Sequence, residues 1–316
     1  MAQSKITLEQ YIGYRKKYAV TGKKKADVGK IVAFVILALF SLIWVLPFFI
    51  MLFGSLRGHQ DLMNHPGKLF NPPSGFTLES YKILLFNEWP ETMQHNSSQK
   101  AEIGYWLMNS CFSAVGGTCL YLLVASLAAY AFTFIDFRYR NVLFGILIGT
   151  LVIPGVATSV GNQSLVYDLG LNKSILALII PGLGGVYGMY LIRTFFSSIP
   201  KDLIESAKMD GYSNLKIFTK IVLPLGKTVI FVQGLFGFMG AWNDLVWPQM
   251  LYGTKDTKLW TLQVGMAYVI NNSKANVNSI GFAFAGGVLC VLPVLVVYLI
   301  AQDKIIEGMA STGVKR

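Results

Sequence analysis

The long apolar stretches of this sequence hold none of the charged residues on which proton transfer and most enzyme chemistry depend. Six such stretches contain no Asp, Glu, Lys or Arg, and Asp136 and Asp244 stand only at the ends of two of them. Acid–base and nucleophilic catalysis need paired carboxylates, or a nucleophile beside its base, in one site. The residues therefore disfavour a membrane-embedded enzyme and a proton-coupled carrier, although backbone carbonyls could still hold Na⁺ in an ion-coupled carrier. The stretches fall near 31–53, 106–134, 142–160, 174–192, 228–243 and 279–301.

The cysteines and histidines form no metal or redox motif. The three cysteines lie inside apolar stretches and make no CxxC pair, so we interpret them as small packing residues. The three histidines share the segment 54–105, but their spacing matches no metal-binding motif. These residues are Cys111, Cys119, Cys290, His59, His65 and His95. We therefore predict no metal site in this chain.

One triplet has the residues that end a phosphate-binding loop. The sequence GKT stands at 226–228, but the loop also requires a glycine at position 221, where this chain has Ile221. The triplet also follows Pro224 and opens an apolar stretch, whereas the loop joins a strand to a helix. We predict that the chain binds no cofactor, so that ATP and Mg²⁺, if they drive it, are bound by a partner.

Amides and aromatic rings inside the apolar stretches are the remaining candidates for contact with a solute. Aromatic faces stack on sugar rings and amides hydrogen-bond to hydroxyls, so this mixture suits a neutral polyhydroxylated solute. The alternative is a structural role, in which these side chains form hydrogen bonds between helices or belong to the aromatic belt at the membrane interface. The candidate substrate path contains Asn109, Tyr187, Gln233, Trp242 and Asn243.

A charged segment between two apolar stretches has the start and stop signals of a short helix, a turn and a second helix. Pro200 suits a first helical turn, and Asp202 and Lys208 match the two ends of the helix dipole. Gly211 stands where a left-handed residue ends a helix, and Ser213 can cap the next helix. The face of the first helix is small, which favours docking in a protein groove over lying on lipid. This face contains Leu203, Ile204 and Ala207.

The elements that carry these residues are membrane spans. The chain is 53% hydrophobic and 14% charged, with a mean hydropathy of +0.52, whereas soluble domains carry about 25% charged residues. A spanning helix needs roughly 20 apolar residues, so we predict an all-α polytopic membrane protein with six transmembrane helices. The fifth stretch is short, and we extend its helix back through Pro224, which suits a first turn. Pro154 and Pro181 are expected to kink the third and fourth helices.

The distribution of Lys and Arg gives the orientation. With the N-terminus inside, the cytoplasmic segments hold 19 Lys or Arg and the external segments 8. This bias places both termini in the cytoplasm. The expected organisation is a basic cytoplasmic segment 1–30, a first helix with a long external loop over 31–105, a core over 106–301, and a cytoplasmic tail 302–316. Within the loop only 77–86 is expected to form a helix, with Glu79 in its first turn.

The charged segment resembles the EAA loop of the membrane subunits of bacterial ABC importers. That pattern is Glu-Ala-Ala, three residues, Gly, about nine residues, then Ile-x-Leu-Pro, and "ESAKMDGYSNLKIFTKIVLP" departs from it at Ser206, where the family has Ala. The stretches "LPFFIMLFGSLR" and "LVIPGVATSV" and the ending "QDKIIEGMASTGVKR" resemble the carbohydrate branch, typified by the second membrane subunit of maltose transporters. The matching positions are Glu205, Ala207, Asp210, Gly211, Ile221, Leu223 and Pro224.

This resemblance implies a type I ABC importer transmembrane domain in the bacterial plasma (inner) membrane. In the family the EAA segment is the coupling helix, here at about 200–211, which docks on a cytoplasmic ATPase. The implied coupling residues are Glu205, Ser206, Ala207, Asp210, Gly211, Leu223 and Pro224. The tail 302–316 is expected to reach the ATPase dimer, and the loop before the last span to contact the receptor.

The function expected from the resemblance is ATP-driven, binding-protein-dependent import of a sugar or oligosaccharide by alternating access. The implied partners are a second homologous permease, two ATP-binding subunits that carry ATP and Mg²⁺, and an extracellular or periplasmic solute-binding protein. The chain also contacts membrane lipid, and no nucleic acid is expected. The alternatives are an ABC importer permease for a non-sugar solute, such as a polyamine or phosphate compound, and an ion-coupled secondary transporter.

Overall fold

The computed structural model describes residues 28–65, 67–68, 70, 72, 74–86, 102–253, 256–273 and 279–313. Within these ranges every regular element is a helix, and one isolated antiparallel bridge joins Arg57 to Phe76. The predicted all-α polytopic class is therefore confirmed. Most of the basic segment 1–30 and the part of the long external loop around His95 lie outside the described residues. Two compact units divide the chain, Met1–Ile50 and Met51–Arg316.

Helix α2 (Val28–Ser55) contributes most of its length to the first unit. It has 28 residues, contains Pro47, and carries no acidic residue in its first turn and no basic residue in its last. Its apolar side chains face outward almost throughout, as expected of a helix whose solvent is lipid. The first predicted span, 31–53, is therefore one helix, as expected.

The second unit is organised around a long helix formed by α5 (Ile103–Cys111), the π-helical turn η1 (Phe112–Gly116) and α6 (Gly117–Phe134). Together these elements form one candidate membrane span of 32 residues, which confirms the second predicted span. Helix α17 (Ser279–Gly313) is the other long element of the unit. It continues past the expected boundary at 301, so the described part of the expected tail is helical.

Three further spans are bent pairs of helices. Helix α7 (Arg140–Gly149) with η2 (Thr150–Val152) meets α8 (Gly155–Asp168) at 105°. Helix α9 (Leu176–Ile179) with η3 (Ile180–Gly184) meets α10 (Val186–Phe196) at 47°. The third pair, which bends by 79°, joins α12 (Asn214–Ile217), η4 (Phe218–Val222) and α13 (Leu223–Leu225) to α14 (Lys227–Asn243).

These bends confirm the kinks expected at two prolines and correct two predicted spans. Ile153 and Pro154 both have an extended backbone, with ψ of 120° and 129°. Ile153 is extended because the residue before a proline avoids the helical region. The span predicted as one helix over 142–160 is therefore broken there. Pro181 lies in the tight turn η3, beside the second bend. The fifth span does not run back through Pro224, because the chain turns at Gly226.

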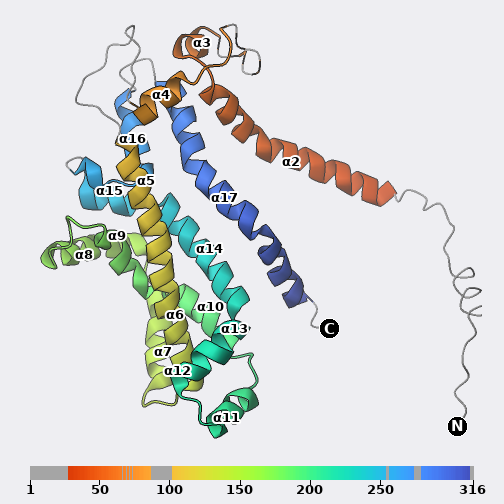
Figure 1. Ribbon diagram of the computed structural model, residues 1–316, viewed down its shortest axis with the longest axis vertical. Coiled ribbons are helices and arrows are strands. Elements are labelled where there is room, and N and C mark those ends of the chain that lie inside the picture. Colours follow the sequence, from red (N-terminus) through yellow and green to blue (C-terminus); the bar gives the residue numbers. More distant parts are fainter. Residues whose placement is uncertain are drawn as a thin grey trace, which may run out of the picture. The chain divides into compact units, whose positions relative to one another are not determined.

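The remaining helices lie at the two ends of the second unit. At one end are α3 (His59–Asn64), α4 (Glu79–Phe86), α15 (Val246–Tyr252), the turn η5 (Thr257–Leu259) and α16 (Leu262–Ser273). At the other end α11 (Lys201–Met209) follows α10 and precedes α12, as Figure 1 shows. The opposite placement of these groups agrees with the predicted alternation of external and cytoplasmic segments.

Each end of the second unit has its own buried core. The Trp106 cluster includes Trp106, Trp242, Trp260, Tyr252 and Phe282, so it joins the elements α5, α14, α15, α16 and α17. The Phe218 cluster includes Tyr130, Ile192, Phe196, Ile204, Ala207, Ile217, Phe218 and Val222, so it joins α6 and α10 to α11, α12 and η4. Between the two clusters, the side chain of Tyr121 packs where a Cβ at Gly185 or Gly188 would stand. Helix α10 therefore lies close against α6.

The segment after α2 is fixed by a buried ion pair that the sequence did not predict. The Arg57 Nε donates to Asp61 Oδ2 at 2.7 Å, and both side chains are at most 1% exposed. Nη2 of Arg57 also donates to the carbonyls of Asp61 and His65 at 3.0 and 2.8 Å. Helix α3 is therefore held in a segment that was expected to be irregular. Helix α4 was expected, and the Thr77 hydroxyl accepts from the Glu79 amide at its start.

The charge of Arg57 also shapes the protonation of its partner. Burial raises the pKa of the Asp61 carboxyl, but hydrogen bonds from Arg57 and Ser74 and the positive charge of Arg57 outweigh burial. The pKa of Asp61 therefore lies below its ordinary value. The Asp61 carboxylate therefore stays ionised at neutral pH. It depends on Arg57, because removal of the guanidinium would leave an uncompensated buried negative charge.

The close approach of α16 to α5 gives a prediction for Gly265→Ala. A Cβ at Gly265 would stand 2.1 to 2.5 Å from ring atoms of Trp106. Overpacking costs about 1–3 kcal/mol, which exceeds the roughly 0.5–1 kcal/mol usually gained when Ala replaces a helical Gly. We expect a lower unfolding temperature for the purified importer, followed by tryptophan fluorescence. Gly104→Ala is the control, since open space surrounds that position in α5, and an unchanged temperature for Gly265→Ala would contradict this packing.

The buried ion pair gives a second prediction, for Arg57→Lys. Lysine keeps the charge but lacks the planar fork that reaches one carboxylate and two carbonyls at once. We expect faster amide hydrogen exchange in α3 and at Thr77, whose N–H donates to the Leu56 carbonyl at 2.7 Å. Arg138→Lys, at a cation whose described contact is the Tyr139 ring, is the control and should leave this exchange unchanged. Equal protection in the Arg57→Lys variant would show that charge alone holds the segment.

Candidate functional site

Helix α11 forms the tip of the second unit at the end away from α4 and α16 (Figure 1). Pro200 precedes its first residue, Asp202 lies in its first turn and Lys208 in its last. Acidic groups near the amino end and basic groups near the carboxyl end stabilise a short helix through its dipole. The local signals in the sequence thus account for both the position and the length of this helix.

The turn after α11 depends on Gly211. Its φ is +77°, a left-handed conformation in which a side chain is strained. The Gly211 amide donates to the Lys208 carbonyl and the Tyr212 amide to the Ala207 carbonyl, both at 3.0 Å, which is the hydrogen-bond pattern of a Schellman motif. No atom lies within 4 Å of a Cβ placed on Gly211. The constraint on this position is therefore the backbone conformation and not a lack of space.

The start of α12 is fixed by a cap. The hydroxyl of Ser213 accepts from the Lys216 amide at 3.4 Å, so Ser213 caps α12 as the sequence predicted. The Lys216 Nζ also lies 3.8 Å from the centroid of the Tyr212 ring. The turn that joins α11 to α12, residues 210–213, is thus defined on both sides by local contacts.

The small face of α11 packs on the chain's own bundle. Ile204 and Ala207 are buried in the Phe218 cluster, whereas Leu203 is exposed. The face expected to be free for a partner is thus mostly occupied, because a helix beside a bundle buries its apolar side chains there first. The small Ala207 allows α11 to pack closely beside α12. In the same cluster the rings of Tyr130 and Phe218 lie 5.3 Å apart.

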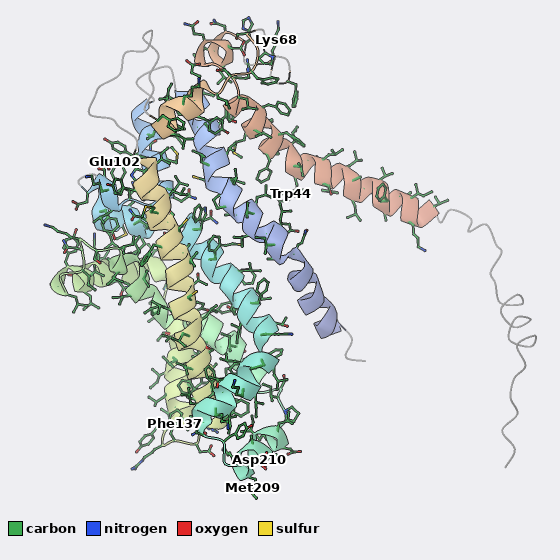
Figure 2. All side chains as sticks on the ribbon, in the orientation of Figure 1. Trp44, Lys68, Glu102, Phe137, Met209 and Asp210 are labelled. Atoms are coloured by element: carbon green, nitrogen blue, oxygen red, sulfur yellow. The ribbon has the colours of Figure 1, made fainter. Side chains whose placement is uncertain are left out.

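The opposite face of α11 is open. Met209 is 88% exposed, and Glu205, Ser206, Asp210 and Gly211 are exposed as well. Figure 2 shows Met209 and Asp210 at the extreme end of the second unit, on the side opposite Glu102. The structure therefore brings five of the predicted coupling residues together in α11 and its turn, Glu205, Ser206, Ala207, Asp210 and Gly211. Of these, only Ala207 is buried.

The other two predicted coupling residues, Leu223 and Pro224, lie in α13, just before the bend at Gly226. A Cβ at Gly226 would stand 2.5 Å from a ring atom of Phe196. The backbone is still bonded through the bend, since the Gly226 amide donates to the Val222 carbonyl and its carbonyl accepts from Ile230. Neither Gly226 nor Phe196 was singled out from the sequence, although Pro224 and Gly226 together signal a break.

The five candidate path residues do not converge on one site. The Asn109 Nδ2 donates to the carbonyls of Lys258 and Trp260 at 2.8 and 2.9 Å and so holds the η5 segment. Trp242 is 1% exposed and its Nε1 donates to the Cys290 carbonyl at 2.9 Å. Asn243 is exposed at the end of α14, where its Nδ2 donates to the Met239 carbonyl. Gln233 is buried, at 5%, and Tyr187 is 62% exposed.

A pocket of about 560 Å³ lies instead between α6, α8, η3, α14 and α15. None of the five candidate path residues lines it. Its polar lining consists of hydroxyls, one amide and one carboxylate, and two of its lining residues are aromatic. The residues of these kinds are Ser113, Thr118, Tyr121, Thr158, Ser159, Asn162, Asp244 and Trp247. Sequence reasoning missed this site because it treated the third span as unbroken.

The comparisons with known proteins agree with this architecture. The family described as "Binding-protein-dependent transport system inner membrane component" matches residues 19–310. The arabinooligosaccharides transport system permease protein AraQ of Bacillus subtilis (strain 168) is 26% identical over 275 residues, which cover 87% of this chain and 92% of AraQ. The diacetylchitobiose uptake system permease protein NgcG of Streptomyces coelicolor is 26% identical over 283 residues, covering 89% and 87% of the two chains.

A solved structure shares the fold. One chain of a bacterial ABC transporter involved in the import of the acidic polysaccharide alginate superposes with a TM-score of 0.71 at 23% identity. The match covers 89% of this chain and 98% of that chain. The family match spans nearly the whole sequence and includes α11 and the turn at Gly211. The chain therefore belongs to the family of binding-protein-dependent transport system inner membrane components, as a membrane permease and not as the ATP-hydrolysing part of an ABC importer.

Proposed function

We propose that this permease couples ATP hydrolysis on cytoplasmic partner subunits to the import of a sugar or oligosaccharide. The observation that carries the proposal is the exposed tip formed by α11 and its left-handed turn at Gly211, which is seated on the bundle through the Phe218 cluster. A protruding helix with a free polar face and a buried apolar face suits force transfer from a second protein. The residues proposed to contact the ATPase are Glu205, Ser206, Met209 and Asp210.

The packing of the helices supports a route by which a displacement of α11 could reach the membrane-spanning helix α14. Ile204 and Ala207 share one cluster with Ile217, Phe218 and Val222, so α11 and η4 move together. Close-packed interiors transmit displacement because they deform little. The bend at Gly226 then connects η4 and α13 to α14, whose residues Gly237 and Gly240 line the pocket. A shift of α11 would thus reach the pocket through one continuous chain of helices.

The importer works by alternating access in this proposal. The chain pairs with a second homologous permease and two ATP-binding subunits, and a solute-binding protein docks on the external face. Each partner shifts the equilibrium only if it binds one of the two states more tightly. The end of the unit that carries α11 faces the cytoplasm, with both termini on the same side, which agrees with the excess of Lys and Arg in those segments. The helical tail beyond 301 is proposed to reach the ATPase dimer.

A sugar is the solute that the relatives and the pocket both favour. Two relatives are named as transport proteins for arabinooligosaccharides and diacetylchitobiose. The pocket offers hydroxyls, an amide and two aromatic rings, a mixture that suits polyhydroxylated solutes. The solute itself would be delivered by the receptor, whose contact we place on the external segment 244–278 and on the loop 54–105.

The coupling proposal is tested by Gly211→Val in the reconstituted importer. A β-branched residue in the left-handed region costs about 1–2 kcal/mol, which disfavours the turn by roughly tenfold. We expect normal membrane insertion and ATP hydrolysis but about tenfold lower ATP-driven sugar uptake. Gly211→Asn is the matched control, because Asn tolerates this conformation. Normal uptake by the Val variant would refute the role of the turn, and uptake driven by an ion gradient without ATP would favour an ion-coupled carrier.

The contact with the ATPase is tested by crosslinking from Met209→Cys. A thiol at this exposed position should be captured by a short bifunctional reagent on the ATP-binding subunit of the assembled importer. Met63→Cys is the matched control, since Met63 is also exposed but lies on α3 at the opposite end of the unit. Crosslinks from Met63→Cys and none from Met209→Cys would reverse the proposed orientation.

A further inference from the structure

We infer that the 560 Å³ pocket is a solute subsite within this chain that accepts an uncharged sugar unit, and that the Asp244 carboxylate keeps anionic sugars out of it. The inference rests on the proposed function, because it names the site and the charge class of the same solute. The pocket differs from the path expected from the sequence, whose residues mostly serve contacts within the chain.

The pocket exists because two spans are broken beside it. The 105° bend after Pro154 turns α8 away from α7, and η3 interrupts the next span at Pro181. Helices α8 and α15 then lie next to each other on one flank of the second unit (Figure 1). No atom lies within 4 Å of a Cβ placed on Gly155, Gly182 or Gly240, and all three residues line the pocket. Its volume falls in the range of about 300–1,000 Å³ for small-molecule sites.

The lining suits a neutral sugar. The Trp247 indole is fixed in place, since its Nε1 donates to the Ala177 carbonyl at 3.1 Å, and its ring and that of Tyr121 line the pocket. The Thr118 hydroxyl is buried and has no hydrogen-bond partner. A buried hydroxyl without a partner is costly, and Thr118 belongs to the lining of the pocket. A sugar supplies hydroxyls for the polar lining and a ring face for the aromatic side chains.

The only charged side chain among the residues that line the pocket is negative. Asp244 supplies the one carboxylate, and no Lys or Arg is among the residues that line the pocket. One oxygen of Asp244 accepts from the Trp247 amide at 3.2 Å, which fixes the carboxylate at the start of α15. A fixed negative charge beside low-dielectric walls repels anions strongly. Uronates and sugar phosphates are therefore disfavoured, whereas neutral sugars can hydrogen-bond to the carboxylate.

The test measures thiol accessibility at Gly240→Cys in the assembled importer, in a chain whose three native cysteines are replaced by Ala. The probes are methanethiosulfonate reagents of matched size that carry a trimethylammonium or a sulfonate group. Relative to a reference thiol at Gly145→Cys in α7, where a Cβ also meets open space, the sulfonate reagent should react about tenfold more slowly than the cationic one. Adding Asp244→Asn should bring the two rates within about twofold, whereas Asp168→Asn should not change them.

Two outcomes of the rate comparison, and two of the protection assay described below, overturn the inference. Equal rates for both reagents with Asp244 present would show that the carboxylate does not control entry. No modification by either reagent would show that the pocket is filled in the assembled importer, by the second permease or by a lipid chain. The occupant is tested in the same assay, since neutral pentose, hexose or N-acetylhexosamine trisaccharides should slow modification and a galacturonate trisaccharide should not. Protection by none of them, or by the uronate equally, also refutes the subsite.

Measurements of ATP-driven sugar uptake distinguish a failure of this inference from a failure of the proposed function. Gly240→Leu places a branched side chain inside the pocket, where it would clash with a bound sugar, and should lower ATP-driven sugar uptake at least about fivefold. Gly145→Leu should leave uptake unchanged. Equal uptake by the two variants would refute the subsite and leave the importer function intact. No ATP-driven uptake of any neutral sugar by the unsubstituted importer would refute the proposed function itself.

Discussion

The structure depends on one constraint, which is that backbone N–H and C=O groups inside a bilayer need partners within the protein. Breaks in spanning helices are therefore confined to places where the freed groups are satisfied nearby. After Pro154 the carbonyl of that residue accepts from the Ala157 amide, and at the second break Gly185 accepts from Met189. At Gly226 the amide and the carbonyl both remain bonded. At each bend, at least one backbone group at the break is therefore hydrogen-bonded within the chain.

The breaks in the spanning helices lie beside the pocket and beside the Phe218 cluster, the two regions in which we propose that the protein acts. The breaks at Pro154 and Pro181 open space beside α6 and α14, and the lining of that space includes several glycines and hydroxyl-bearing side chains. The break at Gly226 stands next to Phe196 in the Phe218 cluster, which also contains Ile204 and Ala207 of α11. Irregular backbone in membrane proteins is tolerated where it lines a cavity or is covered by protein, and this chain uses both conditions.

Local signals in the sequence were enough for the coupling tip but not for the pocket. Pro200, Asp202, Lys208, Gly211 and Ser213 each act through neighbours a few residues away, so helix ends and the left-handed turn could be predicted. The six apolar stretches gave the class of protein for the same reason. The Arg57–Asp61 pair depends on how α3 folds back on its own start, and the pocket depends on bend angles. Proline and glycine mark a possible break, but tertiary packing sets its direction.

Helix α14 joins the Phe218 cluster to the pocket. It begins at Lys227, directly after the bend at Gly226, and ends at Asn243, next to the pocket carboxylate of Asp244. Its 17 residues give a rod about 25 Å long. A rotation of roughly 10° about the bend at Gly226 would displace the far end by about 4 Å, because displacement grows with distance from the pivot. In the proposed coupling mechanism, a displacement of this size would move the pocket lining at Gly240 and Asp244.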